Sequence, residues 1–290
     1  MRKIRFLAEA AILYATYGFF SLLSPEAASN IGGMIGRTIG RFHPFSDRAQ
    51  KNITRALPEL SPESVKKAII GMWDNLGRVF AEYPHLEKIA AKNVTVINRH
   101  IVEDVIKKGQ GGIFIGAHLA NWEISIPTLL IQHNVAAHVT YRAANNPYSD
   151  RLLEKSRSLN GRIKGFPKSR SSAKDLMTAL KNKEFLGILV DQKFNEGLSV
   201  PFFGIPAMTN TAFVLLAQKF KCPLIPTQTR RTGAARFEII VHDPLTIFDD
   251  QGNPLPPEQV ISVVHALFEK NIREAPAHWL WLHRRWGKID

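Results

Sequence analysis

Hydrophobic and polar positions form two different patterns along this chain of 290 residues. From about residue 94 onward, short apolar runs recur between glycine, proline and polar residues, as is typical of buried strands. Longer segments with helical spacing lie between them. The predicted strands cover residues 94–98, 112–116, 136–141, 185–190, 223–229 and 236–241, and the predicted helices 101–108, 147–159, 171–181, 209–221 and 256–274. This alternation predicts an α/β fold, with a mixed, largely parallel sheet flanked by helices.

The first 23 residues have a different pattern. A basic start, with Arg2, Lys3 and Arg5, precedes a mostly apolar stretch at residues 6–23, in which Glu9 is the only charge. The stretch approaches the length that spans a bilayer, whereas Glu9 argues against deep lipid exposure and for a marginal span or an in-plane anchor. A buried first helix is the alternative. We expect a membrane anchor, spanning or in-plane, with its basic end on the cytoplasmic side.

Residues 24–92 are predicted to be helical. Ser61-Pro62 is a strong helix start, and glycines at residues 32, 33, 36 and 40 favour close approach of another helix, either in a membrane or in an ordinary core. Asn75, Arg78 and Glu82 share one side of the helix that follows Pro62. The chain is thus predicted to comprise an anchor helix (1–23), a helical region packed on the core (24–92) and an α/β catalytic core (93–290).

The amino-acid composition limits the classes of partner and of site that the protein can have. The formal net charge of +13 indicates an anionic partner, such as a membrane surface, a phosphorylated substrate or an acidic protein. Nucleic acid is not expected, because no nucleic-acid-binding motif appears and the first segment is too apolar. The single cysteine, Cys222, excludes a disulfide framework and a cysteine-based zinc site, and is expected in the core. No metal or other cofactor is expected.

The candidate chemistry centres on residues 111–130, where a buried strand opens into an apolar helical run. Sites in α/β proteins lie at such strand ends. We place His118 on the turn and Glu123 in the first helical turn, reaching back toward it, since positions five apart do not share a helix face. A histidine oriented by a carboxylate can act as a general base, and amides near Ala120 and Asn121 could stabilise an oxyanion. The structural alternative is that Glu123 only complements the helix dipole.

Asn121-Trp122 lies within this pair, directly before Glu123, and four further motifs follow. They are Tyr141-Arg142 with Asn146-Pro147, Asp191-Gln192, Pro201-Phe202-Phe203-Gly204, and Trp281-Leu282-His283-Arg284-Arg285. In order and spacing, the five motifs resemble the late acyltransferase family of lipid A biosynthesis, of the lauroyl and myristoyl type. The resemblance spans most of the chain.

The resemblance implies a glycerolipid-acyltransferase-like fold at the cell inner membrane, with the catalytic core facing the cytoplasm. Such an enzyme moves a fatty acyl chain from an acyl carrier protein thioester to a hydroxyl of a lipid A precursor, in lipopolysaccharide biosynthesis. The implied catalytic residues are His118 as general base and Glu123 as its partner. The implied substrate-binding residues are Arg142, Asp191, Asn121 and Gln192. Without a Gly-x-Ser-x-Gly elbow, direct transfer is expected rather than a covalent acyl-enzyme.

Three other regions have a composition that indicates their surroundings. Phe202, Phe203 and Phe213 are expected either to wall an acyl slot or to lie in the core. The tryptophans and arginines of residues 279–286 suit a membrane interface. The basic loop, with Arg162, Lys164, Lys168 and Arg170, could meet lipid phosphates, an acidic carrier protein or solvent.

Two other functions compete with this reading. Phospholipid-precursor acyltransferases carry Asp where this chain has Glu123, and residues 165–169 lack their Phe-Pro-Glu-Gly-Thr-like block, which argues against a glycerol-phosphate acceptor. Another glycolipid or an aminolipid is an alternative acceptor. The chain could also be a basic membrane-binding protein in which the His118–Glu123 pair is purely structural.

Overall fold

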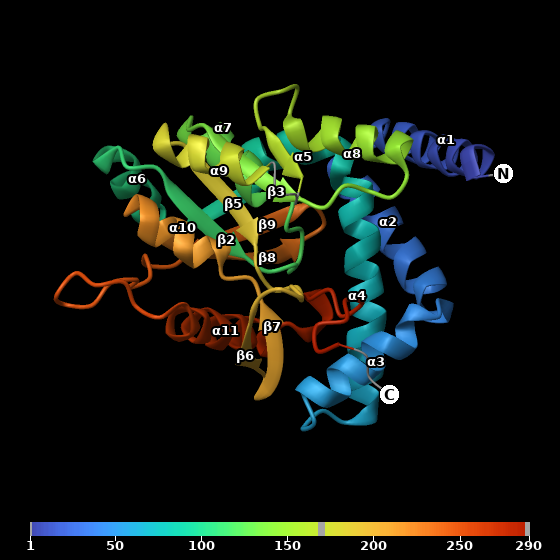
Figure 1. Cartoon of the computed structure of the whole chain (residues 1–290). Helices are drawn as coiled ribbons and strands as arrows, with labels where there is room; N and C mark the ends of the chain where they lie inside the picture. The colour runs from blue at the N-terminus through green and yellow to red at the C-terminus, as the bar shows by residue number, and fades with distance from the viewer. Residues whose placement is uncertain (1, 168–171, 288–290) are drawn as a thin grey trace.

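The computed structural model describes residues 2–167 and 172–287 (Figure 1). Its N-terminal part is helical, and the first strand begins at Val94. Serine caps and first-turn prolines start two of these helices, since Ser24 accepts a hydrogen bond from the Ala27 amide and Ser61 accepts one from the Ser64 amide. The helices are α1 (Arg2–Ser21), α2 (Pro25–Ile39), α3 (Phe45–Ala56), α4 (Pro62–Glu82) and α5 (Leu86–Lys92), with 3-10 turns η1 (Gly40–Phe42) and η2 (Tyr83–His85).

A seven-stranded sheet follows, in the order β1-β9-β8-β2-β5-β3-β4. Neighbouring strands are parallel except β8 and β9, which confirms the predicted mixed, largely parallel sheet. The strands are β1 (Val94–Ile97), β2 (Gly112–Gly116), β3 (Ala137–Tyr141), β4 (Gly165–Pro167), β5 (Phe185–Leu189), β8 (Leu224–Gly233) and β9 (Arg236–Val241). The helices among and after them are α6 (Arg99–Lys108), α7 (Ser125–His133), α8 (Pro147–Ser158), α9 (Ser172–Lys181), α10 (Ala212–Phe220) and α11 (Pro257–Glu274).

Helices cover both faces of this sheet, so β2 at its centre is buried along its whole length. Ile113 and Ile115 point to the face packed by α9, α10 and α11, and Phe114 points to the face packed by α5, α6 and α7. Residues of α3 and α4 join the first of these core clusters. The helical region therefore packs directly on the α/β core.

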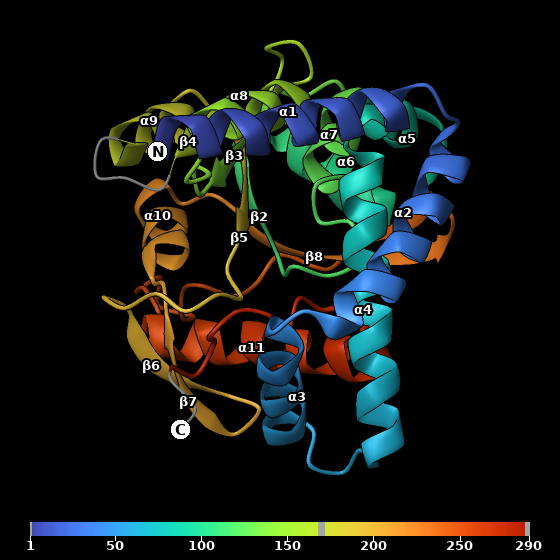
Figure 2. The same ribbon diagram turned by 90° about the vertical axis from the view of Figure 1, so that its right-hand side faces the viewer.

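The glycines of α2 bring it against α4, as Figure 2 shows. A Cβ on Gly32 would meet Ala81 and the backbone of Gly77, and one on Gly36 would meet the carbonyl of Trp73. Only glycine permits backbones to approach this closely. The close helix approach predicted from these residues is thus confirmed, and it occurs between two helices of the same chain.

Helix α1 lies along α8 on the surface (Figure 2). The Asn146 side chain caps α8 and also donates to the Phe6 carbonyl, at 2.8 Å, and to Glu9, at 3.1 Å. Ser156 of α8 donates to the Tyr17 hydroxyl at 3.2 Å. Among the helices of residues 2–167 and 172–287, none is both long enough and apolar enough to cross a membrane.

A two-stranded hairpin, β6 (Leu198–Phe202) and β7 (Ile205–Thr209), stands apart from the sheet. Its turn is the predicted apolar motif, and both turn residues have positive φ, 55° at Phe203 and 70° at Gly204. Two consecutive residues with positive φ are typical of the tight turns that join the two strands of a twisted hairpin. The hairpin packs against α11. Cys222 is buried, as expected.

Candidate active site

Two parallel neighbouring strands deliver the first two functional side chains. Gly116, the last residue of β2, pairs with Leu189, the last residue of β5. His118 and Asp191 each stand two residues beyond this pair, so parallel pairing brings them to the same edge of the sheet. This edge is where α/β folds place their sites.

Asp191 holds His118 by both its ring and its backbone. The ring Nδ1 lies 2.7 Å from Asp191 Oδ1, and the backbone amide of His118 donates to Oδ2 at 2.9 Å. Trp279 Nε1 also donates to Oδ2, at 2.7 Å. Although burial acts to raise the pKa of Asp191, the charge of His118 and these hydrogen bonds hold that pKa far below its ordinary value.

An ionised Asp191 fixes the tautomer of His118. A carboxylate only accepts hydrogen bonds, so Nδ1 carries the proton and Nε2 keeps a free lone pair. The Gln192 amide nitrogen lies 3.2 Å from Nε2 and donates to it. His118 is therefore prepared to accept a proton at Nε2, the property required of a general base.

Glu123 lies elsewhere than predicted. Helix α7 begins at Ser125, so the placement of Glu123 in its first turn is wrong. The carboxylate turns toward Tyr83 and Arg157 rather than back to the ring of His118. The Tyr83 hydroxyl donates at 2.7 Å, and Arg157 donates from Nε and Nη2, each at 2.9 Å. The predicted orienting position beside His118 is occupied by Asp191.

Arg157 keeps the largely buried carboxylate of Glu123 ionised. Burial acts to raise the pKa of Glu123, but the Arg157 guanidinium and the hydrogen bonds from Arg157 and Tyr83 outweigh it and lower that pKa. Burial and the charge of Glu123 raise the pKa of Tyr83, so its hydroxyl remains a donor. Trp122 joins this cluster to His118, because its ring lies 5.2 Å from the imidazole and its Nε1 donates to Glu123 at 3.2 Å.

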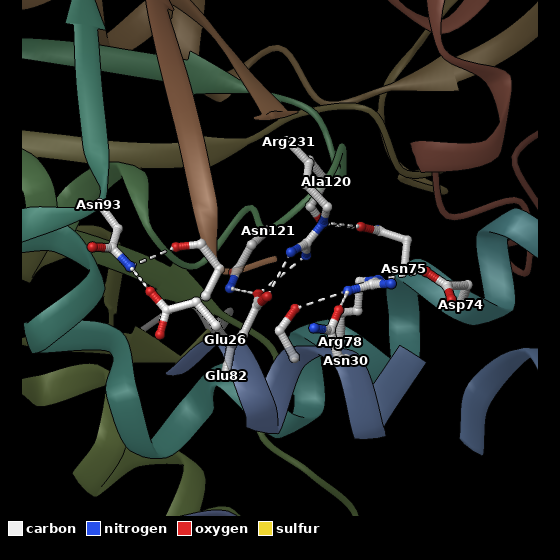
Figure 3. A network of polar contacts seen from close by, with 12 residues as sticks. Glu26, Asn30, Asp74, Asn75, Arg78, Glu82, Asn93, Ala120, Asn121 and Arg231 are labelled. Carbon is white, nitrogen blue, oxygen red and sulfur yellow. Dashed lines mark hydrogen bonds and ion pairs between the residues drawn. The ribbon is translucent and has the colours of Figure 1, made fainter. Parts of the chain in front are cut away.

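A buried polar network fixes the loop between His118 and Glu123 (Figure 3). Asn121 has no exposed surface, and its side chain donates to Glu82 at 2.8 Å. Arg231 of β8 forms an ion pair with Glu82 at 2.5 Å and donates to Asn75 at 3.1 Å. Asn75 in turn donates to the Ala120 carbonyl at 2.9 Å, where the backbone has a φ of 49°. Asn121 thus positions the loop from within.

The segment after α11 closes the site from the other side. The Ala120 amide donates to the His278 carbonyl at 3.0 Å, and the Leu280 amide donates to the His118 carbonyl at 3.1 Å. Trp279 and Trp281 are buried, as is the Arg285 side chain, so the expectation that this segment lies at a membrane interface is wrong for these three. Because its N–H is already bonded, Ala120 is also not the expected oxyanion donor.

The remaining predicted residues lie in varied surroundings. Arg142 is exposed just beyond β3 and has no hydrogen bond or ion pair with a residue that the structure describes, so its role in substrate binding stays a prediction. Phe202 and Phe213 are fully buried in the core. Arg162 pairs with Glu87 at 3.3 Å, and Lys168 and Arg170 lie outside the described residues. Among described residues, no group of three or more His, Cys, Asp or Glu side chains could hold a metal ion.

Sequence reasoning missed Tyr83, Arg157, Arg231 and Trp279 as parts of this site. The common side of Asn75 and Glu82 on their helix was the only signal for the network, because a sequence does not show which strand faces that helix. Arg157 carried no signal, since it resembles any other charge on the surface of an amphipathic helix.

The sequence is similar to those of known proteins over most of its length. Residues 2–288 match the sequence model of the bacterial lipid A biosynthesis acyltransferase family. The lipid A biosynthesis palmitoleoyltransferase of Escherichia coli K12 is 24% identical over 266 residues, covering 87% of this chain and 83% of that protein, and the lipid A biosynthesis acyltransferase of Shigella flexneri gives the same values. The lauroyltransferase of Escherichia coli K12 is 24% identical over 248 residues, covering 81% and 76%. The chain therefore belongs to the bacterial lipid A biosynthesis acyltransferases and is an acyltransferase enzyme.

Proposed function

We propose that this enzyme transfers a fatty acyl chain from an acyl carrier protein thioester to a hydroxyl of a lipid A precursor, with His118 as general base. The observation that carries the proposal is the bond between His118 Nδ1 and the ionised, buried Asp191, which leaves Nε2 free to accept a proton. Asp191 thus takes the orienting role that the sequence assigned to Glu123.

The chemistry is a single displacement at the thioester carbonyl. As the acceptor oxygen attacks, its proton moves to His118 Nε2 and a C–O bond forms, giving a tetrahedral oxyanion. Collapse of this intermediate breaks the C–S bond, and the imidazolium proton passes to the departing sulfur. The charges of Asp191 and Glu123 favour the imidazolium that forms between these steps.

Membrane association belongs to the same proposal, and the exposed side chains of α1 support it. Ile4 is 73% exposed, Ile12 68% and Phe19 50%, although all three are apolar. Such a surface on a helix packed along the protein suits a position in the plane of the membrane, on the cytoplasmic leaflet of the inner membrane. The net charge of +13 suits both anionic lipid and an acidic donor protein.

The reaction is tested by mass spectrometry of products made by purified enzyme from a lipid A precursor and acyl carrier proteins loaded with chains of several lengths. A gain of one acyl group, absent with His118→Ala, supports the proposal. Transfer only to other glycolipids or aminolipids would change the acceptor. No transfer to any acceptor, from an enzyme shown to be folded, would contradict the proposed activity.

Membrane association is tested separately by flotation with vesicles of anionic lipid. Ile12→Asp and Phe19→Asp should release the protein from the vesicles, because they place charge on the apolar face of α1. Thr54→Asp on the exposed side of α3 is the matched control. Equal flotation of all three variants would contradict the in-plane position of α1.

A further inference from the structure

The tetrahedral oxyanion needs hydrogen-bond donors, and four backbone amides of the loop after β2 are already bonded within the protein. The amides of Leu119 and Ala120 donate to Ala117 and His278, at 2.7 and 3.0 Å. The Glu123 amide donates to the Asn121 side chain at 3.1 Å. The His118 amide is bonded to Asp191. These donors are engaged in holding the loop and cannot turn toward a substrate without undoing it.

Gln192 is different, because its donor is aimed at the reacting atom itself. Its amide nitrogen lies 3.2 Å from His118 Nε2, the lone pair that has to accept the hydroxyl proton. Gln192 is only partly buried, and its bond to Nε2 is the one hydrogen bond of its side chain to a residue that the structure describes. An incoming acceptor hydroxyl takes that place at Nε2 and displaces the amide by a short distance.

We propose that Gln192 is the donor that stabilises the oxyanion during acyl transfer. This inference rests on the proposed function and adds to it a catalytic residue. In the resting enzyme the Gln192 N–H groups are bonded to His118, and in the transition state they donate to the former carbonyl oxygen. The amide is neither consumed nor deprotonated, and it returns to Nε2 when the ester leaves. A neutral amide suits this task, because it strengthens its bond as negative charge develops on the oxygen.

The test compares wild type with Gln192→Met, which keeps the length of the side chain but has no donor. With the thioester donor, kcat should fall about 10²–10³-fold, the usual effect of removing one oxyanion donor, while KM for the acyl carrier protein changes little. Gln192→Lys, which restores a donor, should recover part of this loss. Gln259→Met is the matched control, since Gln259 is exposed on α11.

A second donor substrate separates oxyanion stabilisation from a structural role. An acyl carrier protein loaded through a dithioester presents C=S, whose sulfur is a weaker hydrogen-bond acceptor than oxygen. Wild type should prefer the thioester strongly, and Gln192→Met should lose most of this preference. An unchanged kcat in Gln192→Met, or an equal loss with both donors, would overturn the assignment. Absence of transfer by wild type would instead contradict the proposed function itself.

Discussion

His118 and Asp191 are 73 residues apart in sequence, yet Asp191 accepts hydrogen bonds from both the ring and the backbone amide of His118. The two bonds go to different oxygens of one carboxylate. Position and tautomer of the base are thus set by a single side chain. Because Oδ2 also accepts from Trp279, each carboxylate oxygen has a defined partner.

Replacing Asp191 by Asn should remove the base while keeping the fold. Two donors, the His118 amide and Trp279 Nε1, converge on Oδ2, so the Asn oxygen will take that position and its NH₂ group will face Nδ1. The proton of His118 then moves to Nε2, which can no longer accept one. We expect kcat to fall about 10³–10⁴-fold with little change in KM.

Glu123→Gln is the comparison for this experiment, measured in the same steady-state assay. It neutralises the carboxylate bound by Arg157 and Tyr83 without touching the Nδ1 bond, so its loss of kcat should be clearly smaller. An equal or larger loss in Glu123→Gln would restore Glu123 as the principal partner of His118.

Breaking the ion pair between Arg231 and Glu82 should destabilise the protein. Arg231→Met leaves the fully buried Glu82 carboxylate without its counter-charge, which typically lowers the free energy of unfolding by about 3–5 kcal/mol. Adding Glu82→Gln removes that charge while keeping an acceptor for Asn121, so the double variant should regain part of the loss. Urea unfolding of wild type and both variants checks this. Identical unfolding midpoints for wild type and Arg231→Met would show that the ion pair does not stabilise the protein.

The contact between α2 and α4 predicts opposite effects of two identical substitutions. Gly77→Ala places a methyl group against the backbone of Gly32 and should lower the free energy of unfolding by about 1–3 kcal/mol. Gly18→Ala in α1 meets no atom within 4 Å and should raise helix stability by up to about 1 kcal/mol. Thermal unfolding measures both. Equal shifts of the midpoint would contradict the close packing described for Gly77.

Stability should depend on pH through His265. Burial lowers its pKa to about 4, below the ordinary value of 6.5, and its ring is fixed between the Pro201 carbonyl and Arg285. The unfolded chain therefore binds more protons between these values, so stability is full above pH 6.5 and is lost as pH falls toward 4. The loss amounts to about 3 kcal/mol.

The check is the difference in unfolding free energy between wild type and His265→Gln across this pH range. Gln cannot titrate, so the variant should lose less stability on acidification than wild type. Parallel pH curves would show that His265 does not contribute.

The sequence predicted six of the seven strands of the sheet, because apolar runs bounded by turn residues leave few other structures. It missed β4, a three-residue strand in the segment predicted as a basic loop. It placed His118 at the right strand end. The partner of His118 was assigned by proximity in sequence, which favoured Glu123. The actual partner comes from the neighbouring strand, and strand order is a property of the whole fold that local patterns do not contain.

The prediction for the tryptophans was wrong for the same reason, because local sequence does not show what the fold places around a side chain. A segment with Trp279, Trp281 and two arginines has the composition of a membrane interface, yet these tryptophans pack together, with ring centres 4.5 Å apart, beneath the active site. Trp279 satisfies its N–H on Asp191 and Trp281 satisfies its N–H on the Pro276 carbonyl. Composition cannot distinguish a polar tip that meets lipid headgroups from one that meets a buried acceptor.

The tethering of the loop at Ala120 has a consequence for hydrogen exchange. Its amide and carbonyl are bonded to segments that precede and follow it by long stretches of sequence, at Asn75 and His278. The Ala120 amide can therefore exchange with solvent only when the segment after α11 moves away from it. The exchange rate of this one amide then reports how often that segment leaves the catalytic loop.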